Sequence, residues 1–107
     1  MFNLFHKIPS VSPREAAEKI SESNSGFIDV RTREEYDTAH ASGAINIPLG
    51  ELQGHIDSFR KFDMVYVICA TGGRSGRAAA HLLGEGINAV NVSGGTSAWR
   101  EEGLLME

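Results

Sequence analysis

The sequence predicts an α/β protein with one five-stranded, mostly parallel sheet and helices on both faces. Short apolar runs rich in β-branched residues alternate along the chain with segments of helical spacing, and no internal repeat interrupts this order. Strands that alternate with helices form βαβ units, whose right-handed crossovers place helices on both faces of a parallel sheet. With 107 residues, the chain has the length of a single domain, which we expect to span residues 1–107.

The first helix has a clear start. Ser12 and Glu15 have the spacing of a capping box, and Pro13 occupies the first helical position, where its missing N–H costs nothing. An apolar stripe follows, and the polar residues 21–26 predict the turn that ends this helix.

The next two elements place charged residues at the end of a strand. Residues 27–30 predict a buried strand, and Thr32 and Glu35 have the spacing of a second capping box. A short helix is therefore expected to begin directly after Arg31. Asp29 and Arg31 then lie at the carboxyl end of the strand, the edge at which open parallel sheets bind their ligands.

The remaining chain continues the alternation. Residues 44–47 predict a strand closed by Pro48, residues 49–60 predict a weaker helix, and residues 64–68 predict another strand. After residue 68 we expect a helix from near Arg74 to Gly84 or Gly86, a strand at residues 87–92, a break at Gly94 and Gly95, and a last helix through Ala98 and Trp99 that ends at Gly103. Four of the five expected strands are thus located in the sequence.

Composition narrows the classes of partner. The chain is 41% hydrophobic and 22% charged with a formal net charge of −4, which is typical of a globular domain and gives no reason to expect nucleic acid or a membrane as partner. A single cysteine cannot form an internal disulfide, so nothing ties the protein to an oxidising compartment, and any thiol that resolves an oxidised Cys69 must come from outside.

The N-terminal residues 1–10 are expected to be an extension that packs on the domain or is free. They lack the charged and continuously apolar regions of a signal peptide, and no stretch of the chain reaches the ~20 apolar residues of a membrane span. We therefore expect a cytoplasmic protein.

Residues 64–75 contain the strongest chemical signal. An apolar strand ends at Cys69, a loop with Gly72 and Gly73 follows, and a helix begins near Arg74. Such a loop turns its N–H groups inward, and the helix adds the partial positive charge of its N-terminus at the same place. These groups and the Arg74 guanidinium favour the thiolate, the nucleophilic form of cysteine.

The alternative is that Cys69 is an inert buried residue, because free cysteine is among the most buried residue types. The strand end, the two glycines, Arg74 and the small hydroxyl residue Ser75 all fall within seven positions of each other. This combination favours a reactive thiolate.

Several motifs spread over nearly the whole chain occur together. They are the Asp29-Val30-Arg31 turn, Glu35-Tyr36, His40 before Gly43-Ala44, Asn46-Ile47-Pro48-Leu49, the Cys69 loop with Gly72, Arg74 and Ser75, and Gly94-Gly95 with Trp99. In this combination the chain resembles a single-domain rhodanese. The resemblance implies a sulfurtransferase that carries a sulfane sulfur as a persulfide on Cys69.

The residues suit that chemistry. A Cys69 thiolate attacks the outer sulfur of a donor, such as thiosulfate or a low-molecular-weight persulfide, and the resulting anionic persulfide needs hydrogen-bond donors. Cyanide or a thiol, which could belong to a thioredoxin-like protein, then takes the sulfur and restores Cys69. No cofactor is required beyond the covalent persulfide. The candidate donors are the loop residues Ala70, Thr71, Gly72, Gly73, Arg74 and Ser75, of which Arg74 could instead brace the loop through carbonyl contacts.

Two other functions use related residues. Cysteine phosphatases and arsenate reductases have a Cys-x5-Arg loop, whereas Cys69 and Arg74 are spaced as Cys-x4-Arg, which removes one amide and up to ~3.3–3.6 Å of contour. A nucleotide site of the Walker type would need a Gly-Lys-Ser/Thr sequence, which is missing. A rhodanese-like module that binds or senses sulfur or oxidants without turnover remains the non-enzymatic alternative.

Most other candidate residues favour structural roles. Asp29 and Arg31 are expected to form an ion pair that supports the loops at the site edge, in preference to a direct substrate contact. Trp99 is expected in the core. Gly72, Gly73, Gly94 and Gly95 are expected at positions of positive φ or close approach. No metal site is expected, because no metal-ligand spacing joins Cys69 with His6, His40, His55 or His81.

Overall fold

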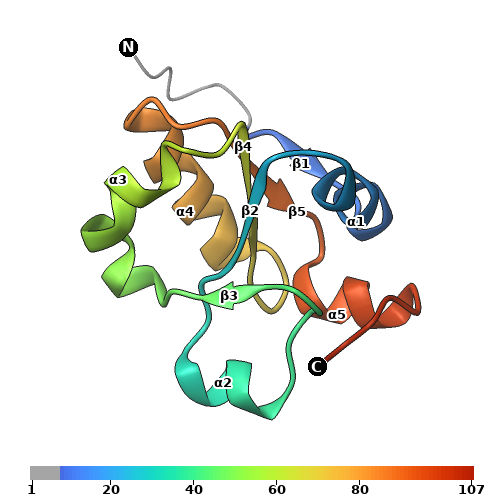
Figure 1. Ribbon diagram of the computed structural model, residues 1–107. Helices are drawn as coiled ribbons and strands as arrows, with labels where there is room; N and C mark the ends of the chain where they lie inside the picture. The colour runs from blue at the N-terminus through green and yellow to red at the C-terminus, as the bar shows by residue number, and fades with distance from the viewer. Residues whose placement is uncertain (1–7) are drawn as a thin grey trace.

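A five-stranded parallel sheet in the order β1-β5-β4-β2-β3 runs through the computed structural model, which describes residues 8–107 (Figure 1). All four strand pairings are parallel, so the predicted architecture is confirmed. The strands are β1 (Ser10–Val11), β2 (Ser25–Asp29), β3 (Ile45–Asn46), β4 (Met64–Ile68) and β5 (Ala89–Val92). The helices are α1 (Pro13–Glu22), α2 (Arg33–Thr38), the 3-10 helix η1 (Leu49–His55), α3 (Ile56–Phe59), α4 (Gly73–Gly84) and α5 (Gly95–Glu101).

Helices cover both faces of the sheet. Helices α1 and α5 lie on one side, α3 and α4 lie on the other, and α2 lies beyond the end of β2 (Figure 1). Side chains alternate along the central strand β4 with the period of two that strands impose. Val65 and Val67 are buried against α3 and α4, whereas Tyr66 and Ile68 are buried with the core residues of α1 and α5. The sheet is therefore apolar on both faces, as a buried parallel sheet requires.

The two predicted helix starts are present. The Ser12 hydroxyl accepts the Glu15 N–H at 3.1 Å, and at Thr32 both bonds of the capping box form with Glu35. Each cap satisfies backbone N–H groups that have no partner inside the helix.

Several helix and strand boundaries in the first half of the chain differ from the sequence prediction. Helix α1 continues to Glu22, and β2 begins already at Ser25, because Ser25 and Gly26 pair with the start of β4. The predicted turn at residues 21–26 is therefore limited to a short connection. The strand expected at 44–47 is reduced to β3, which lies at the edge of the sheet.

The weak helix expected at residues 49–60 is not one α-helix. It consists of the 3-10 helix η1 followed by the single-turn helix α3. Gly50 and Gly54 both lie in η1, and glycine disfavours a regular α-helix by about 1 kcal/mol relative to alanine. The predicted apolar residues are nevertheless buried, namely Leu52, Ile56 and Phe59.

The first strand, which the sequence did not locate, is β1. It has two residues, so its pattern is too short to recognise, and its backbone pairs with β5. The Asn91 N–H donates to the Pro9 carbonyl at 2.9 Å, which brings the end of the predicted extension 1–10 into the sheet. Residues 1–7 of that extension lie outside the described residues. Within residues 8–107, no helix has the length and apolar character needed to cross a membrane.

Candidate active site at the Cys69 loop

Cys69 directly follows the central strand β4 and is buried, with 1% of its surface exposed. Asp29 is in register with Ile68, and the Val30 N–H donates to the Ile68 carbonyl at 3.0 Å. The carboxyl ends of β2 and β4 therefore meet. The expectation that Asp29, Arg31 and Cys69 share one edge of the sheet is confirmed.

Gly72 and Ser75 donate hydrogen bonds to the Cys69 sulfur. The Gly72 N–H lies 3.1 Å from Sγ, and the Ser75 hydroxyl lies 3.2 Å from it. Gly72 caps the 12-residue helix α4 with a φ of 112°, a conformation that favours glycine. This conformation turns the Gly72 N–H back toward the sulfur, at the N-terminal end of the helix.

The balance of these contacts lowers the pKa of Cys69. Burial of the thiol raises its pKa, but hydrogen bonds from the Ser75 hydroxyl and from the amides of Ser75, Gly72 and Thr71 lower it by more. The resulting pKa of Cys69 lies below that of an ordinary thiol, so a larger fraction of Cys69 is thiolate at neutral pH. The local pattern on which the sequence prediction rested thus has a physical basis in the loop.

Asn91, which the sequence analysis did not select, holds both donor residues in place. The single hydroxyl proton of Ser75 is shared between two acceptors, Cys69 Sγ and Asn91 Oδ1, the latter 2.5 Å from the Ser75 oxygen. The Asn91 Nδ2 donates to the Gly72 carbonyl at 3.2 Å. Asn91 lies on β5, whose pairing with β4 places it beside the loop. A polar residue within an otherwise apolar strand was the only sequence signal that could have identified it.

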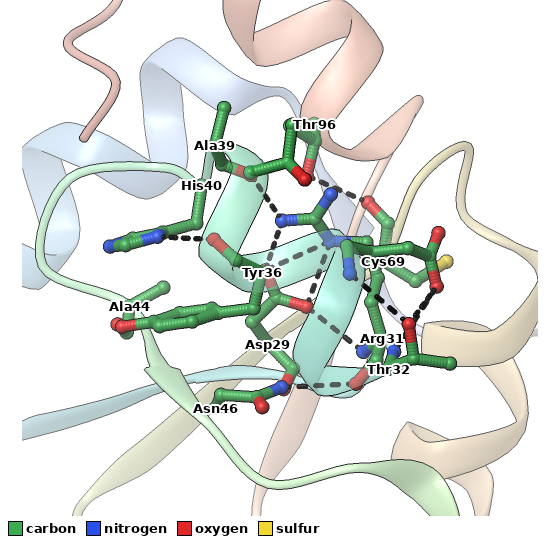
Figure 2. Close-up of polar contacts among 12 residues, drawn as sticks. Asp29, Arg31, Thr32, Tyr36, Ala39, His40, Ala44, Asn46, Cys69 and Thr96 are labelled. Atoms are coloured by element: carbon green, nitrogen blue, oxygen red, sulfur yellow. Dashed lines mark hydrogen bonds and ion pairs between the residues drawn. The ribbon is translucent and has the colours of Figure 1, made fainter.

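The start of α5 supports the loop from the other side. The Thr96 N–H and hydroxyl donate to the Cys69 carbonyl at 2.8 and 3.1 Å (Figure 2). The Ser97 N–H donates to the Ala70 carbonyl at 3.1 Å. A Cβ at Gly95, which has a φ of 59°, would collide with these two carbonyls. The prediction of special glycine positions holds for Gly72, Gly94 and Gly95, but it is wrong for Gly73, which has ordinary backbone angles and open space around it.

Arg74 pairs with a carboxylate of α2. Its two terminal nitrogens donate to the two oxygens of Glu35 at 2.7 and 3.0 Å, and no bond from Arg74 to the sulfur occurs among residues 8–107. The sequence analysis left two roles open for Arg74, a charge beside the thiolate and a brace through carbonyl contacts. In the structure Arg74 braces the loop against α2, with a carboxylate as its partner instead of carbonyl groups.

Asp29 and Arg31 form the predicted ion pair (Figure 2). The Arg31 guanidinium donates to both oxygens of Asp29, the shortest contact being 2.8 Å, and also to the Ala39 carbonyl at 2.7 Å. Both side chains are buried, with exposed fractions of 8% for Arg31 and 0% for Asp29. The pair joins the end of β2 to the segment after α2, which is the supporting role that the sequence favoured.

The other selected side chains have structural contacts. Trp99 is buried as expected, its ring lies tilted at 5.2 Å from that of Phe27, and its indole N–H donates to the Leu105 carbonyl. His40 stacks at 3.6 Å on Tyr36 and lies 3.3 Å from a Glu107 carboxylate oxygen. In the described part of the chain, no three His, Cys, Asp or Glu side chains are grouped so that they could hold a metal ion.

The protein is thus a parallel α/β domain with a cysteine loop between its central strand and a helix N-terminus. Residues 12–102 match the sequence model of the rhodanese-like domain. The chain therefore belongs to the rhodanese-like family, as its motifs predicted.

Individual relatives agree with this assignment. The chain is 37% identical over 94 residues to thiosulfate sulfurtransferase 16 of Arabidopsis thaliana, and the match covers 73% of this chain and 76% of the relative. It is 36% identical over 94 residues to YrkF of Bacillus subtilis, whose name describes a "putative sulfur carrier protein". That match covers 86% of this chain and 51% of YrkF, so the chain spans about half the length of this relative.

A solved structure also agrees. The crystal structure of a rhodanese-like domain protein from Staphylococcus aureus superposes with a TM-score of 0.80 at 37% identity. The match covers 92% of this chain and 97% of that protein. The family thus supports sulfur transfer in general terms.

Proposed function

We propose that the protein is a sulfurtransferase that carries a sulfane sulfur as a persulfide on Cys69. The observation that supports this proposal most directly is the pair of donors, the Gly72 N–H and the Ser75 hydroxyl, that point at Cys69 Sγ. They lower the pKa of the thiol, and as uncharged dipoles they can also stabilise an anionic sulfur. The names of the relatives are consistent with this chemistry.

The reaction has two displacement steps. The Cys69 thiolate attacks the outer sulfur of a donor, the sulfur–sulfur bond of the donor breaks, and its electron pair leaves with sulfite or with a thiolate. The enzyme then holds a Cys69 persulfide. In the second step cyanide or a thiol attacks the terminal sulfur, and Cys69 leaves again as a thiolate. The acceptor could be a thioredoxin-like protein, and a cytoplasmic location suits a protein whose single cysteine must stay reduced.

Loop length supports sulfur over phosphoryl transfer. The four residues between Cys69 and Arg74 give a loop in which Gly72 and Ser75 both reach the sulfur directly. A phosphoryl group brings three oxygens that need further donors, which the longer Cys-x5-Arg loop can supply. Binding or sensing without turnover remains the non-enzymatic alternative.

Mass spectrometry of the intact protein separates these functions. After incubation with thiosulfate or glutathione persulfide, the wild-type protein should gain one sulfur atom and lose it again on addition of cyanide. Cys69→Ser keeps the side-chain volume without a comparably acidic group, and it should gain no sulfur although it remains folded. A wild-type protein that never gains sulfur from these donors would contradict the proposal, and one that gains sulfur but never releases it would indicate the sensing module.

A further inference from the structure

The two arginines at the Cys69 edge of the sheet are each neutralised by a carboxylate. Arg31 is paired with Asp29, and Arg74 makes two hydrogen bonds with Glu35. The contacts that reach Cys69 Sγ come instead from uncharged groups, an amide N–H and a hydroxyl. The site can therefore stabilise one negative sulfur through dipoles, whereas its nearby positive charges are already compensated.

Glu35 is held firmly in this role. Its Oε1 accepts the N–H and the hydroxyl of Thr32, both at 3.1 Å, in addition to the bond from Arg74. These contacts tie the carboxylate to the first turn of α2. The hydrogen bond from Arg74 lowers the pKa of Glu35 to about 2, against the opposing effect of burial, so Glu35 is ionised at neutral pH.

This pairing has a consequence for the charge of the sulfur donor. Thiosulfate approaches the Cys69 thiolate as a dianion, and like charges repel each other unless a cation lies nearby. A small alkyl persulfide approaches as a neutral molecule or a monoanion. Because Glu35 compensates Arg74, the guanidinium beside the loop is not free to offset the second charge of thiosulfate.

We propose that Glu35 determines the donor preference of the Cys69 site, by neutralising Arg74 and so favouring alkyl persulfides over dianionic oxyanion donors. The proposal rests on the proposed sulfur transfer and adds the class of donor. With an alkyl persulfide R–S–SH, Cys69–S⁻ attacks the outer sulfur and R–S⁻ leaves, so that the proton remains on the Cys69 persulfide. With thiosulfate, the same attack expels sulfite with the bonding electron pair.

The test compares two donors in one protein. Rates of sulfur loading are measured by mass spectrometry for thiosulfate and for 2-hydroxyethyl persulfide, and the ratio of the two rates is the readout. Any change in Cys69 reactivity or in loop bracing slows or speeds both donors and cancels in this ratio. Glu35→Gln keeps a side chain that capping boxes accept but removes the charge.

We expect Glu35→Gln to raise the thiosulfate-to-persulfide ratio roughly fivefold, which is the effect of a partly exposed ion pair. The thiosulfate rate of the wild type should rise with ionic strength, because salt screens repulsion, and this dependence should weaken in Glu35→Gln. Glu34→Gln is the matched control, since it removes one charge from the same helix at an exposed residue whose side chain does not contact Arg74.

A second variant, Glu35→Asp, separates the loss of charge from a loosening of the loop. Glu35→Asp keeps the charge, so it should retain the wild-type ratio even if the shorter side chain loosens the loop. An unchanged ratio in Glu35→Gln, or an equal change in Glu34→Gln, would overturn the role of Glu35 while sulfur loading still upheld the proposed function. Failure of the wild type to load sulfur from both donors would overturn the proposed function itself.

Discussion

The Ser75 hydroxyl lies 3.2 Å from the Cys69 sulfur, on the first turn of the helix that follows the loop. Ser75 is six positions after Cys69 in the sequence, and the helix start brings the two side chains together. Ser75 is fully buried, so its hydroxyl does not exchange this contact for bulk water. The geometry makes Ser75 the side chain that contributes most to lowering the pKa of the thiol.

The pH dependence of Cys69 alkylation tests this contact. Iodoacetamide reacts with the thiolate, so the midpoint of the curve of alkylation rate against pH should lie below the pKa of a free thiol, which is ~8.5. Ser75→Ala removes a donor to the thiolate and should move the midpoint of the rate–pH curve upward. Ser58→Ala, which removes an exposed hydroxyl that donates to the His55 carbonyl, should leave the midpoint unchanged. A wild-type midpoint at or above the free-thiol value would contradict the prediction.

Asn91→Asp should raise the thiol pKa through two effects of the same sign. The new carboxylate would accept the Ser75 proton more strongly than the amide oxygen does, and it would add a negative charge near the sulfur. The same alkylation measurement reports the shift. Asn88→Asp adds the same charge at an exposed position and should have little effect. Identical midpoints for Asn91→Asp and the wild type would remove Asn91 from the support of the site.

Arg74→Lys should behave like Arg74→Ala in sulfur loading. Lysine keeps the charge but cannot make the two parallel bonds to Glu35, so the loop loses its brace in both variants. We expect a loss on the order of tenfold, because small displacements of a reacting group are costly. Loading rates are compared by mass spectrometry. Recovery of wild-type activity by lysine would show that the charge of Arg74 matters and the brace does not.

Asp29→Asn should strongly destabilise the fold. It leaves the buried Arg31 guanidinium without its charged partner, and breaking such a pair costs about 3–5 kcal/mol. Urea denaturation measures the free energy of unfolding. Asp57→Asn breaks an ion pair at a fully exposed carboxylate and should change this free energy by less than about 0.5 kcal/mol. Equal stability of the two variants would argue against the supporting role of the Asp29–Arg31 pair.

Loop length is the clearest test of sulfur transfer against phosphatase activity. One glycine inserted between Gly72 and Gly73 would change the spacing to Cys-x5-Arg and add about 3.3–3.6 Å of contour. Because Ser75 would move away from the sulfur, sulfur loading should fall, while phosphate and arsenate should become better competitive inhibitors. A glycine inserted between Glu85 and Gly86, in an exposed turn, serves as the control.

The loop experiment also requires both activities to be measured in the wild-type protein. It should load sulfur and should not hydrolyse a small aryl phosphate. Efficient hydrolysis without any gain of sulfur would show that loop length does not separate the two functions in this protein.

Local patterns in the sequence were enough to predict most of the fold. The caps at Ser12 and Thr32 and the strand at residues 64–68 depend on residues a few positions apart, and all three are present. The prediction failed where local signals were weak. Strand β1 is too short to show a period, and residues 49–59, which include two glycines that disfavour an α-helix, form a 3-10 helix and a single α-helical turn.

The candidate site likewise contains residues that the local sequence identifies and residues that only the tertiary structure brings to it. Cys69, Gly72 and Ser75 lie within one strand–loop–helix unit, so the sequence alone identified them and their proximity. Their supporting residues come from other parts of the chain. Asn91 is 16 residues from Ser75, Thr96 is 27 residues from Cys69, and Glu35 is 39 residues from Arg74. Only the pairing of parallel strands and the packing of α2 and α5 at their carboxyl ends bring these groups to the loop, because no local pattern encodes which distant side chain meets a given donor.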